Sequence, residues 1–155
     1  MIYENKELVE ALMEKGLTVT TAESCTGGLI AGAITDVSGS SAVFKRGFVT
    51  YCDEAKMEML GVSEETLEKY TAVSDRVASE MAQGAARVAR ADAAISVTGI
   101  AGPLGGTEDK PVGLVYIGLY CKGKKVVEKH IFKGSREEVR MQAVKSAIHG
   151  LLGML

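Results

Sequence analysis

The stretch Thr21-Ala22-Glu23-Ser24-Cys25-Thr26-Gly27-Gly28 joins an apolar, β-branched run, residues 17–20, to a run of small residues, 29–34. This order predicts a strand, a short junction and a helix, with the hydroxyl of Ser24 and the thiol of Cys25 at the junction. Free backbone N–H groups collect at the start of a helix, where the helix dipole is positive. The junction therefore suits an anion or a developing oxyanion. Taken alone, however, it equally fits an ordinary helix N-cap, since Ser and Thr are favoured there.

Helical and strand patterns alternate on both sides of this stretch. Helices are expected over 5–14, 29–34 and 53–60, after an N-cap at Ser63, from Ser74 onward and from Ser135, where Ser-Arg-Glu-Glu has capping-box spacing. Strands are expected over 17–22, 42–52, 93–97, 112–120 and 126–132, the last two joined by a hairpin turn. The pattern predicts one α/β domain over residues 1–155, a three-layer α/β/α fold with a mixed, mostly parallel sheet. Ligands of such folds lie beyond the carboxyl ends of strands.

Composition excludes several classes of protein. The net charge is −2, and only 5% of the residues are aromatic, so neither nucleic acid nor an anionic membrane is an expected partner. No apolar run approaches the ~20 residues of a membrane span. Three cysteines without CxxC spacing indicate neither disulfides nor a metal site. The first residues have no basic and apolar signal-peptide regions, so the cytoplasm is the expected compartment.

The candidate nucleophile Ser24 needs a base, and the residues offer two kinds. The two histidines, His130 and His149, lie outside the glycine-rich junctions, so a Ser-His-Asp triad has little support. Lys56 is the better candidate, because a lysine that is partly desolvated in a cleft loses its proton near neutral pH. It would act directly or through the hydroxyl of Tyr51, although a solvated lysine on a helix also fits this spacing. Cys25 is the rival nucleophile, although a free cysteine is most often a small buried apolar residue.

Several polar groups could bind an anionic part of a ligand. The loop 36–41 contains Ser40 and Ser41, and a second glycine-rich loop, 98–107, follows a buried strand. Arg136 and Arg140 lie one helical turn apart and would suit a phosphate, and Lys110 is a further candidate. A turn-rich connection and a solvated helix face explain the same residues without a ligand.

Taken together, the motifs resemble those of the CinA C-terminal domain family, which includes stand-alone nicotinamide-nucleotide amidases. The resemblance runs from about Leu8 to Leu152. Its segments are Thr21–Gly28, Gly39-Ser40-Ser41, Tyr51-Cys52-Asp53-Glu54-Ala55-Lys56, Ala72-Val73-Ser74, Val97–Pro103, Lys110-Pro111-Val112-Gly113 and Arg136–Arg140. Several ordered motifs at family-like spacing are a much stronger signal than any one of them.

The resemblance implies an α/β fold and hydrolysis of the carboxamide of nicotinamide mononucleotide, which yields nicotinate mononucleotide and ammonia without a metal or another cofactor. Ser24 would be the nucleophile, activated by Tyr51 and Lys56 in a manner similar to serine β-lactamases. The chain departs from their Ser-x-x-Lys spacing, since Gly27 stands three residues after Ser24. The expected substrate-binding residues are Cys25, Thr26, Gly27, Gly28, Ser40, Ser41, Thr98, Gly99, Ala101, Gly102 and Arg140.

Two other functions stay open at this point. The chain could be a non-catalytic nucleotide-binding module of the family, or an amidase for another carboxamide. The retention of Ser24, Tyr51 and Lys56 favours an enzyme, because a binding pocket alone needs no such trio. The N-terminal partner domain of full-length CinA proteins has no counterpart in these residues, so its pyrophosphatase-type activity is not expected. A homo-oligomer is plausible for an α/β enzyme of this size.

Overall fold

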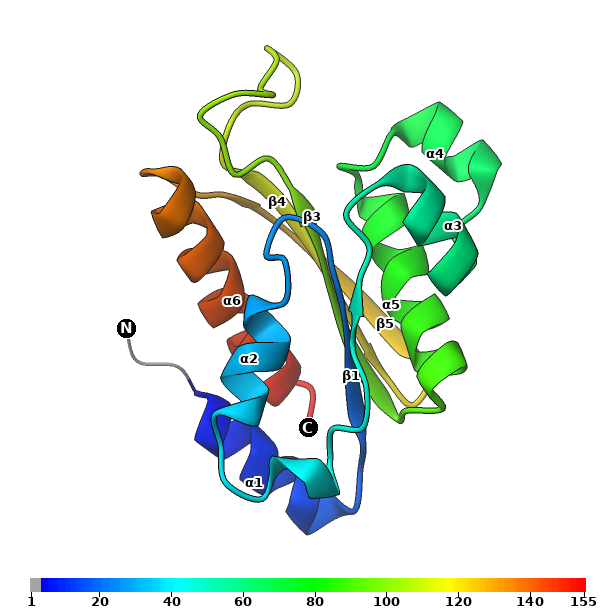
Figure 1. Cartoon of the computed structure of the whole chain (residues 1–155), viewed down its shortest axis with the longest axis vertical. Helices are drawn as coiled ribbons and strands as arrows, with labels where there is room; N and C mark the ends of the chain where they lie inside the picture. The colour runs from blue at the N-terminus through cyan, green and yellow to red at the C-terminus, as the bar shows by residue number, and fades with distance from the viewer. Residues whose placement is uncertain (1–3) are drawn as a thin grey trace.

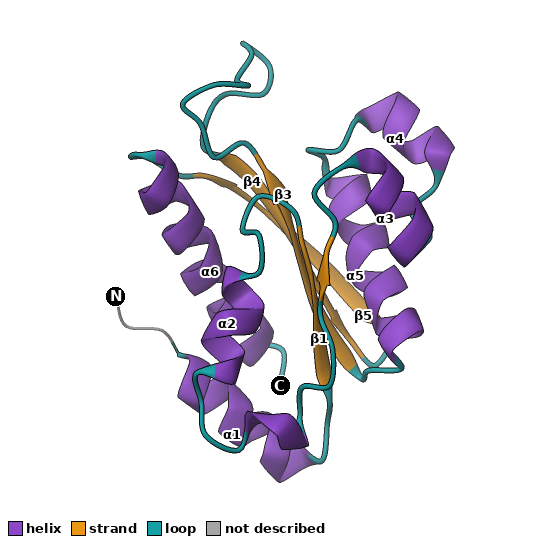
Figure 2. Cartoon of the chain, in the orientation of Figure 1, coloured by secondary structure: helices purple, strands orange, loops and turns teal. Residues whose placement is uncertain are grey.

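The computed structural model describes residues 4–155 and places a five-stranded sheet between two layers of helices (Figure 1). The strands are β1 (Val19–Glu23), β2 (Phe48–Val49), β3 (Ala93–Gly99), β4 (Leu114–Cys121) and β5 (Lys124–Ile131). The helices are α1 (Asn5–Lys15), α2 (Leu29–Thr35), α3 (Asp53–Leu60), α4 (Glu64–Tyr70), α5 (Asp75–Ala89) and α6 (Arg136–Leu152), with a 3₁₀ turn, η1 (Ser40–Ala42). Helices α1, α2 and α6 cover one face of the sheet, and α3, α4 and α5 lie on the other (Figure 2). Residues 1–3 of the predicted domain lie outside the described residues.

The predicted α/β/α layering and the mixed sheet are confirmed, with the strand order β2-β1-β3-β4-β5. The balance within the sheet differs from the expectation of a mostly parallel one. The pairings β1–β2 and β1–β3 are parallel, whereas the longer pairings β3–β4 and β4–β5 are antiparallel. The reason is that a parallel return needs a crossover connection, usually a helix. The chain goes from β3 to β4 through a loop, and from β4 to β5 through a tight turn at Lys122 and Gly123, both with positive φ.

Each face of the sheet has its own apolar core. Between the sheet and α1, α2 and α6, fully buried side chains such as Leu12, Ile117 and Ile148 pack together. On the other face, the core includes Leu60, Val77 and Met81 of α3 and α5. Burying these side chains is the dominant favourable term in folding. The loops at the carboxyl ends of β1 and β3 therefore extend from a sheet that is packed on both faces.

Local sequence signals set most helix boundaries where they were predicted. The Ser135–Glu138 capping box is present, and the hydroxyls of Ser63 and Ser74 accept hydrogen bonds from the N–H groups of Thr66 and Val77. The predicted strand over 42–52 is mostly irregular. Only Phe48 and Val49 pair regularly with β1, since the chain enters from the turn η1 and Phe44 makes just an isolated bridge with Val19.

Ser24 does not cap the helix that follows it. The N-cap of α2 is Gly28, and the buried carboxylate of Glu23 reaches forward to accept hydrogen bonds from the N–H groups of Ile30 and Ala31 and from the hydroxyl of Thr26. A carboxylate at this position satisfies donors that the first helical turn leaves free. The side chain of Ser24 is therefore available for chemistry.

Candidate active site

The register of the sheet aligns Ser24 with two other polar residues. Ala22 of β1 pairs with Phe48 of β2 and with Ser96 of β3. Because side chains two residues apart share a face of a strand, Ser24, Thr50 and Thr98 follow on the same side of the sheet, the side covered by α3 and α5. The first N–H beyond β1, that of Ser24, still donates to the carbonyl of Val97 at 2.9 Å. The nucleophile candidate is thus fixed at the carboxyl end of the central parallel strands.

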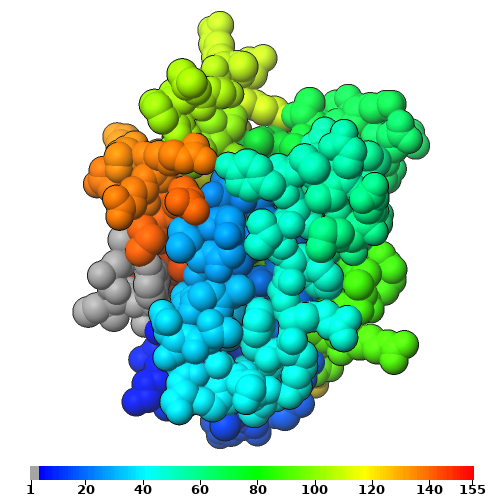
Figure 3. All heavy atoms as spheres, in the orientation of Figure 1, coloured from blue at the N-terminus to red at the C-terminus, as the bar shows by residue number. Residues whose placement is uncertain are grey.

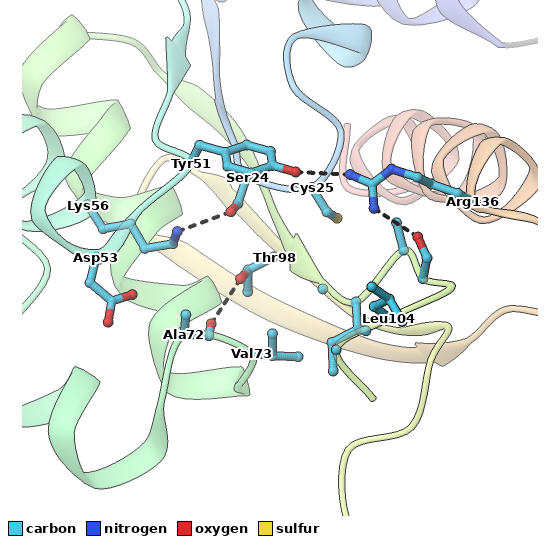
Figure 4. Close-up of a pocket in the computed structure, with 15 residues that line it drawn as sticks. Ser24, Cys25, Tyr51, Asp53, Lys56, Ala72, Val73, Thr98, Leu104 and Arg136 are labelled. Atoms are coloured by element: carbon cyan, nitrogen blue, oxygen red, sulfur yellow. Dashed lines mark hydrogen bonds between the residues drawn. The ribbon is translucent and has the colours of Figure 1, made fainter. Parts of the chain in front are cut away.

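A cavity of about 290 Å³ opens at this edge of the sheet (Figure 4). It is lined by Ser24, Cys25, Tyr51, Asp53, Lys56, Ala72, Val73, Thr98, Gly99, Ile100, Ala101, Gly102, Leu104, Gly105 and Arg136. Four loops, the end of β3 and the first turns of α3 and α6 contribute these residues. Both glycine-rich stretches therefore meet in one cleft, as predicted from their position after β1 and β3.

Lys56 contacts Ser24 at the base of this cavity. Its Nζ lies 3.1 Å from Ser24 Oγ and donates to the carbonyl oxygen of Thr50 at 2.8 Å. Only 1% of Lys56 is exposed, and this burial lowers the pKa of its amine, against the smaller opposing effect of the Asp53 carboxylate. A buried amine within hydrogen-bond distance of a hydroxyl is the arrangement that lets a lysine act as a general base toward serine.

Cys25, the rival nucleophile, is placed less favourably. Its side chain is buried in the core beneath α2, and this burial raises the pKa of the thiol to about 11. The thiolate, which is the reactive form, is therefore scarce at neutral pH. The position near a helix start does not lower this pKa, because removal from water is the larger effect.

Tyr51 lines the cavity without a hydrogen bond to either of the other two members of the predicted trio, within residues 4–155. Its hydroxyl accepts a hydrogen bond of 3.0 Å from Arg136, and among residues 4–155 it has no hydrogen bond to Ser24 or Lys56. Figure 4 shows its ring beside Ser24, with the hydroxyl directed toward α6. Tyr51 is thus near the reacting groups but bound to a different partner.

The loop 98–107 contributes most of the remaining wall. The hydroxyl of Thr98 donates to the carbonyl of Ala72 at 2.9 Å, which ties β3 to the loop before α5. Gly99, Ala101 and Gly102, three of the expected substrate-binding residues, line the cavity, and the carbonyl of Gly102 accepts from Arg136 at 2.8 Å. Lys110 lies outside this cavity, where its amine donates to Tyr70, Thr71 and Val73 and so holds the Ala72–Val73 wall in place.

Arg140 does not line the cavity but contacts the backbone of the turn that follows Ser24. Its guanidinium donates to the carbonyls of Cys25 at 3.0 Å and of Thr26 at 3.3 Å. A Cβ on Gly27, where φ is +57°, would lie 3.3 Å from this guanidinium. Thr26, Gly27 and Gly28 therefore shape the turn around Ser24 without lining the cavity themselves.

Ser40 and Ser41 lie in η1, away from the cavity. Just after η1, Val43 accepts a hydrogen bond from the N–H of Val19, the first residue of β1. The other end of that strand lies about 13 Å away at the usual rise per residue. Ser24 is the residue after that end. A single copy of the chain thus does not bring these two hydroxyls to Ser24.

Several cavity residues were not predicted from the sequence as site residues, namely Asp53, Ala72, Val73, Ile100, Leu104 and Gly105. Asp53 was detectable, since it stands between Tyr51 and Lys56 at the start of a predicted helix. The others lie in segments that the sequence did indicate, the Ala72-Val73-Ser74 motif and the glycine-rich loop 98–107, although nothing marked these residues individually. Among residues 4–155, no three His, Cys, Asp or Glu side chains lie close enough together to hold a metal ion.

Comparison with known proteins assigns the chain to a family. The model of the CinA C-terminal domain matches residues 3–155. The chain belongs to the CinA C-terminal domain family. The nicotinamide-nucleotide amidohydrolase PncC of Escherichia coli K12 is 52% identical over 148 residues, which cover 95% of this chain and 90% of that protein. The protein of the same name from Enterobacter agglomerans is 59% identical over 138 residues, 88% of this chain and 84% of the relative.

Other family members are longer, and solved structures share the fold. A putative competence-damage inducible protein of Caldicellulosiruptor saccharolyticus is 57% identical over 141 residues, but these cover only 34% of its length. A crystal structure of the competence/damage inducible protein CihA from Agrobacterium tumefaciens superposes with a TM-score of 0.92 at 44% identity, covering 99% of this chain and 98% of that one. A CinA superfamily structure from Escherichia coli gives a TM-score of 0.94 at 42% identity, covering 97% and 88%.

Proposed function

We propose that this protein is an amidase that hydrolyses the carboxamide of nicotinamide mononucleotide to nicotinate mononucleotide and ammonia. The observation that carries the proposal is the buried Lys56 amine at 3.1 Å from Ser24 Oγ, at the base of a cavity. Relatives that are 52% and 59% identical to this chain over the aligned residues are named nicotinamide-nucleotide amidohydrolase. A lysine-activated serine is chemically suited to that reaction, because amide hydrolysis needs a nucleophile and a proton carrier.

The first half of the proposed mechanism forms an acyl-enzyme. The neutral amine of Lys56 takes the proton of Ser24, and Ser24 Oγ bonds to the amide carbon. The carbonyl oxygen becomes an oxyanion, which the backbone N–H of Cys25, the residue after the nucleophile, would stabilise. Among residues 4–155, this N–H donates to no other residue. Lys56 then returns the proton to the amide nitrogen, the C–N bond breaks, and ammonia leaves.

The second half consumes water. Lys56, again neutral, takes a proton from a water molecule whose oxygen bonds to the acyl carbon. The ester bond to Ser24 breaks, and the proton returns to Ser24 Oγ, leaving a carboxylic acid on the pyridine ring that releases its remaining proton to solvent as the carboxylate. Thr50 supports both steps, because its carbonyl accepts one N–H of Lys56 and so orients the amine. A part for Tyr51 in transferring the proton to departing ammonia stays a prediction.

We also propose that the protein acts as a homo-oligomer. The support is a group of exposed apolar side chains at the β2 edge of the sheet, namely Leu29, Val49 and Tyr51, which are 36%, 49% and 60% exposed. Leu29 follows Gly28, whose Cβ position lies 3.7 Å from the Val49 side chain. Because Tyr51 lines the cavity, a second copy at this edge would border the active site. A cytoplasmic location remains our expectation, and among residues 4–155 no helix is long and apolar enough to cross a membrane.

The decisive experiment measures ammonia release from nicotinamide mononucleotide by the parent chain and by Ser24→Ala, Lys56→Met and Cys25→Ala. Loss of the nucleophile or of its base lowers kcat by roughly 10³-fold or more. Cys25→Ala is the matched control, since it removes the adjacent thiol and should keep kcat within about 3-fold, because that thiol is protonated and buried. Full activity of Ser24→Ala would overturn the proposal. Binding of the nucleotide without turnover by the parent would favour a binding module instead, and a panel of carboxamides would expose another substrate.

A further inference from the structure

Arg136 presents an uncompensated positive charge to the cavity. One terminal nitrogen of its guanidinium donates to the carbonyl of Gly102 at 2.8 Å and the other to the hydroxyl of Tyr51 at 3.0 Å. Neither acceptor carries a formal charge. In the described part of the chain, both ion pairs within 4.0 Å involve histidines, so no carboxylate neutralises Arg136. A guanidinium has five N–H donors in a planar fork, and these two bonds leave donors free for a ligand.

The charged side chains of the cavity are divided between its two ends. Asp53 and Lys56 come from α3 and lie on one side of Ser24, whereas Arg136 reaches in from α6 on the other (Figure 4). Lys56 is already directed at Ser24 and at the carbonyl of Thr50. Arg136 is thus the lining cation that the proposed chemistry does not use.

The other cations considered for an anion are engaged elsewhere. The guanidinium of Arg140 is bound to the carbonyls of Cys25 and Thr26 and does not line the cavity. The amine of Lys110 has three acceptors on the Tyr70–Val73 segment. Leu104 lines the cavity on the Arg136 side (Figure 4), and among residues 4–155 its backbone N–H donates to no other group. Free N–H groups beside a guanidinium are suited to a phosphate.

We propose that Arg136 binds the 5′-phosphate of the nucleotide substrate, so that the carboxamide lies at Ser24 and the phosphate at the α6 end of the cavity. This inference rests on the proposed function, which supplies the phosphate. It makes Arg136 the residue that distinguishes the nucleotide from the corresponding nucleoside, because a guanidinium and a phosphate dianion pair by two parallel hydrogen bonds. The bond to Tyr51 allows a competing role, in which Arg136 only positions that ring.

The test compares two substrates that differ by the phosphate alone, nicotinamide mononucleotide and nicotinamide riboside. For Arg136→Ala, kcat/KM for the mononucleotide should fall by roughly 10- to 100-fold, the usual effect of losing a charge-assisted pair. Its kcat/KM for the riboside should stay within about 2-fold of the parent's. Arg136→Lys should recover part of the loss. Lys133→Ala is the matched control, because it removes an exposed positive charge that does not line the cavity and should leave both substrates unaffected.

Inorganic phosphate gives a second readout. It should inhibit hydrolysis of the mononucleotide competitively in the parent and much more weakly in Arg136→Ala. An equal loss on both substrates, reproduced by Tyr51→Phe, would overturn the inference and assign Arg136 to positioning Tyr51. A parent that hydrolyses the mononucleotide while Arg136→Ala keeps the parent's preference between substrates would overturn this inference alone. A parent that releases ammonia from neither substrate would instead overturn the proposed function, and the inference with it.

Discussion

The side chains of Ser24, Cys25 and Lys56 show how burial and contacts give different reactivity to residues that look equally suitable in the sequence. Ser24 and Cys25 are adjacent, yet only Ser24 faces the Lys56 amine, while burial raises the pKa of the Cys25 thiol. Lys56 is itself buried, and the same removal from water lowers its pKa. Burial disfavours the charged form of both groups. It therefore suppresses the thiolate and favours the neutral amine that a general base requires.

The charge of Asp53 affects the pH at which Lys56 becomes a neutral base. Its carboxylate favours the protonated form of Lys56 and so opposes the lowering of the Lys56 pKa by burial. The proposed mechanism needs neutral Lys56, so activity should rise with pH through that pKa. Asp53→Asn removes the opposing charge, lowers the Lys56 pKa further and should move the rising limb of kcat/KM to lower pH. The measurement is kcat/KM for ammonia release as a function of pH.

The neighbouring carboxylate provides the control for that shift. Glu54 is fully exposed, does not line the cavity, and is not among the groups that shift the Lys56 pKa. Glu54→Gln should therefore leave the rising limb in place. A limb that moves to higher pH in Asp53→Asn, or that moves equally in both variants, would contradict the assignment of this limb to Lys56.

At the level of elements, the sequence predicted the features that depend on interactions between residues close in the chain. The helix starts at Ser63, Ser74 and Ser135 follow from a hydroxyl that accepts from an N–H three residues later, and the structure contains all three. The strand-turn-helix order around residue 24 was also predictable. The identity of the cap was not, because Glu23 caps α2 from the strand and reaches Ile30, seven residues on. The hydrogen bond from Arg140 to the carbonyl of Cys25 joins residues that are 115 positions apart in the chain, so no local sequence pattern predicts it.

The cap supplied by Glu23 should be a large contributor to stability. The carboxylate is fully buried and accepts three hydrogen bonds from Thr26, Ile30 and Ala31. Glu23→Gln replaces one acceptor oxygen by a donor that faces an N–H group, and should lower the free energy of unfolding by about 1–3 kcal/mol. Urea denaturation followed by circular dichroism measures this. Glu10→Gln, an exposed carboxylate of α1, should change it by less than about 0.5 kcal/mol. Equal effects of the two substitutions would mean that the cap adds little.

At the scale of the whole molecule, the sheet order decides which predicted site residues meet. The Ser40-Ser41 turn is close to Ser24 along the chain. However, β2 runs parallel to β1, so the chain approaches β2 from the opposite end of β1, and the turn lies there. The same order makes β2 and β5 the two edges of the sheet. The space-filling view in Figure 3 shows the segments before and after β2 on one face with the first turn of α2. Neither the edge nor the distant turn can be read from periodicity, because strand order depends on contacts between segments far apart.

The β2 edge is where the proposed oligomer can be tested. Val49 is 49% exposed beside Leu29 and Tyr51, so a second copy packed there would bury it. Sedimentation equilibrium of the parent should give at least twice the chain mass of 16.4 kDa. Val49→Glu should reduce it to the mass of one chain, since burying an unpaired carboxylate at an apolar interface costs several kcal/mol. Val126→Glu, an exposed valine on the opposite edge strand β5, should leave the mass unchanged. A parent that sediments as a single chain would refute the oligomer, and dissociation by Val126→Glu alone would move the interface to β5.

Because Tyr51 belongs to both the edge and the cavity, the monomeric Val49→Glu protein should also show whether the second copy completes the active site, through its KM for the mononucleotide.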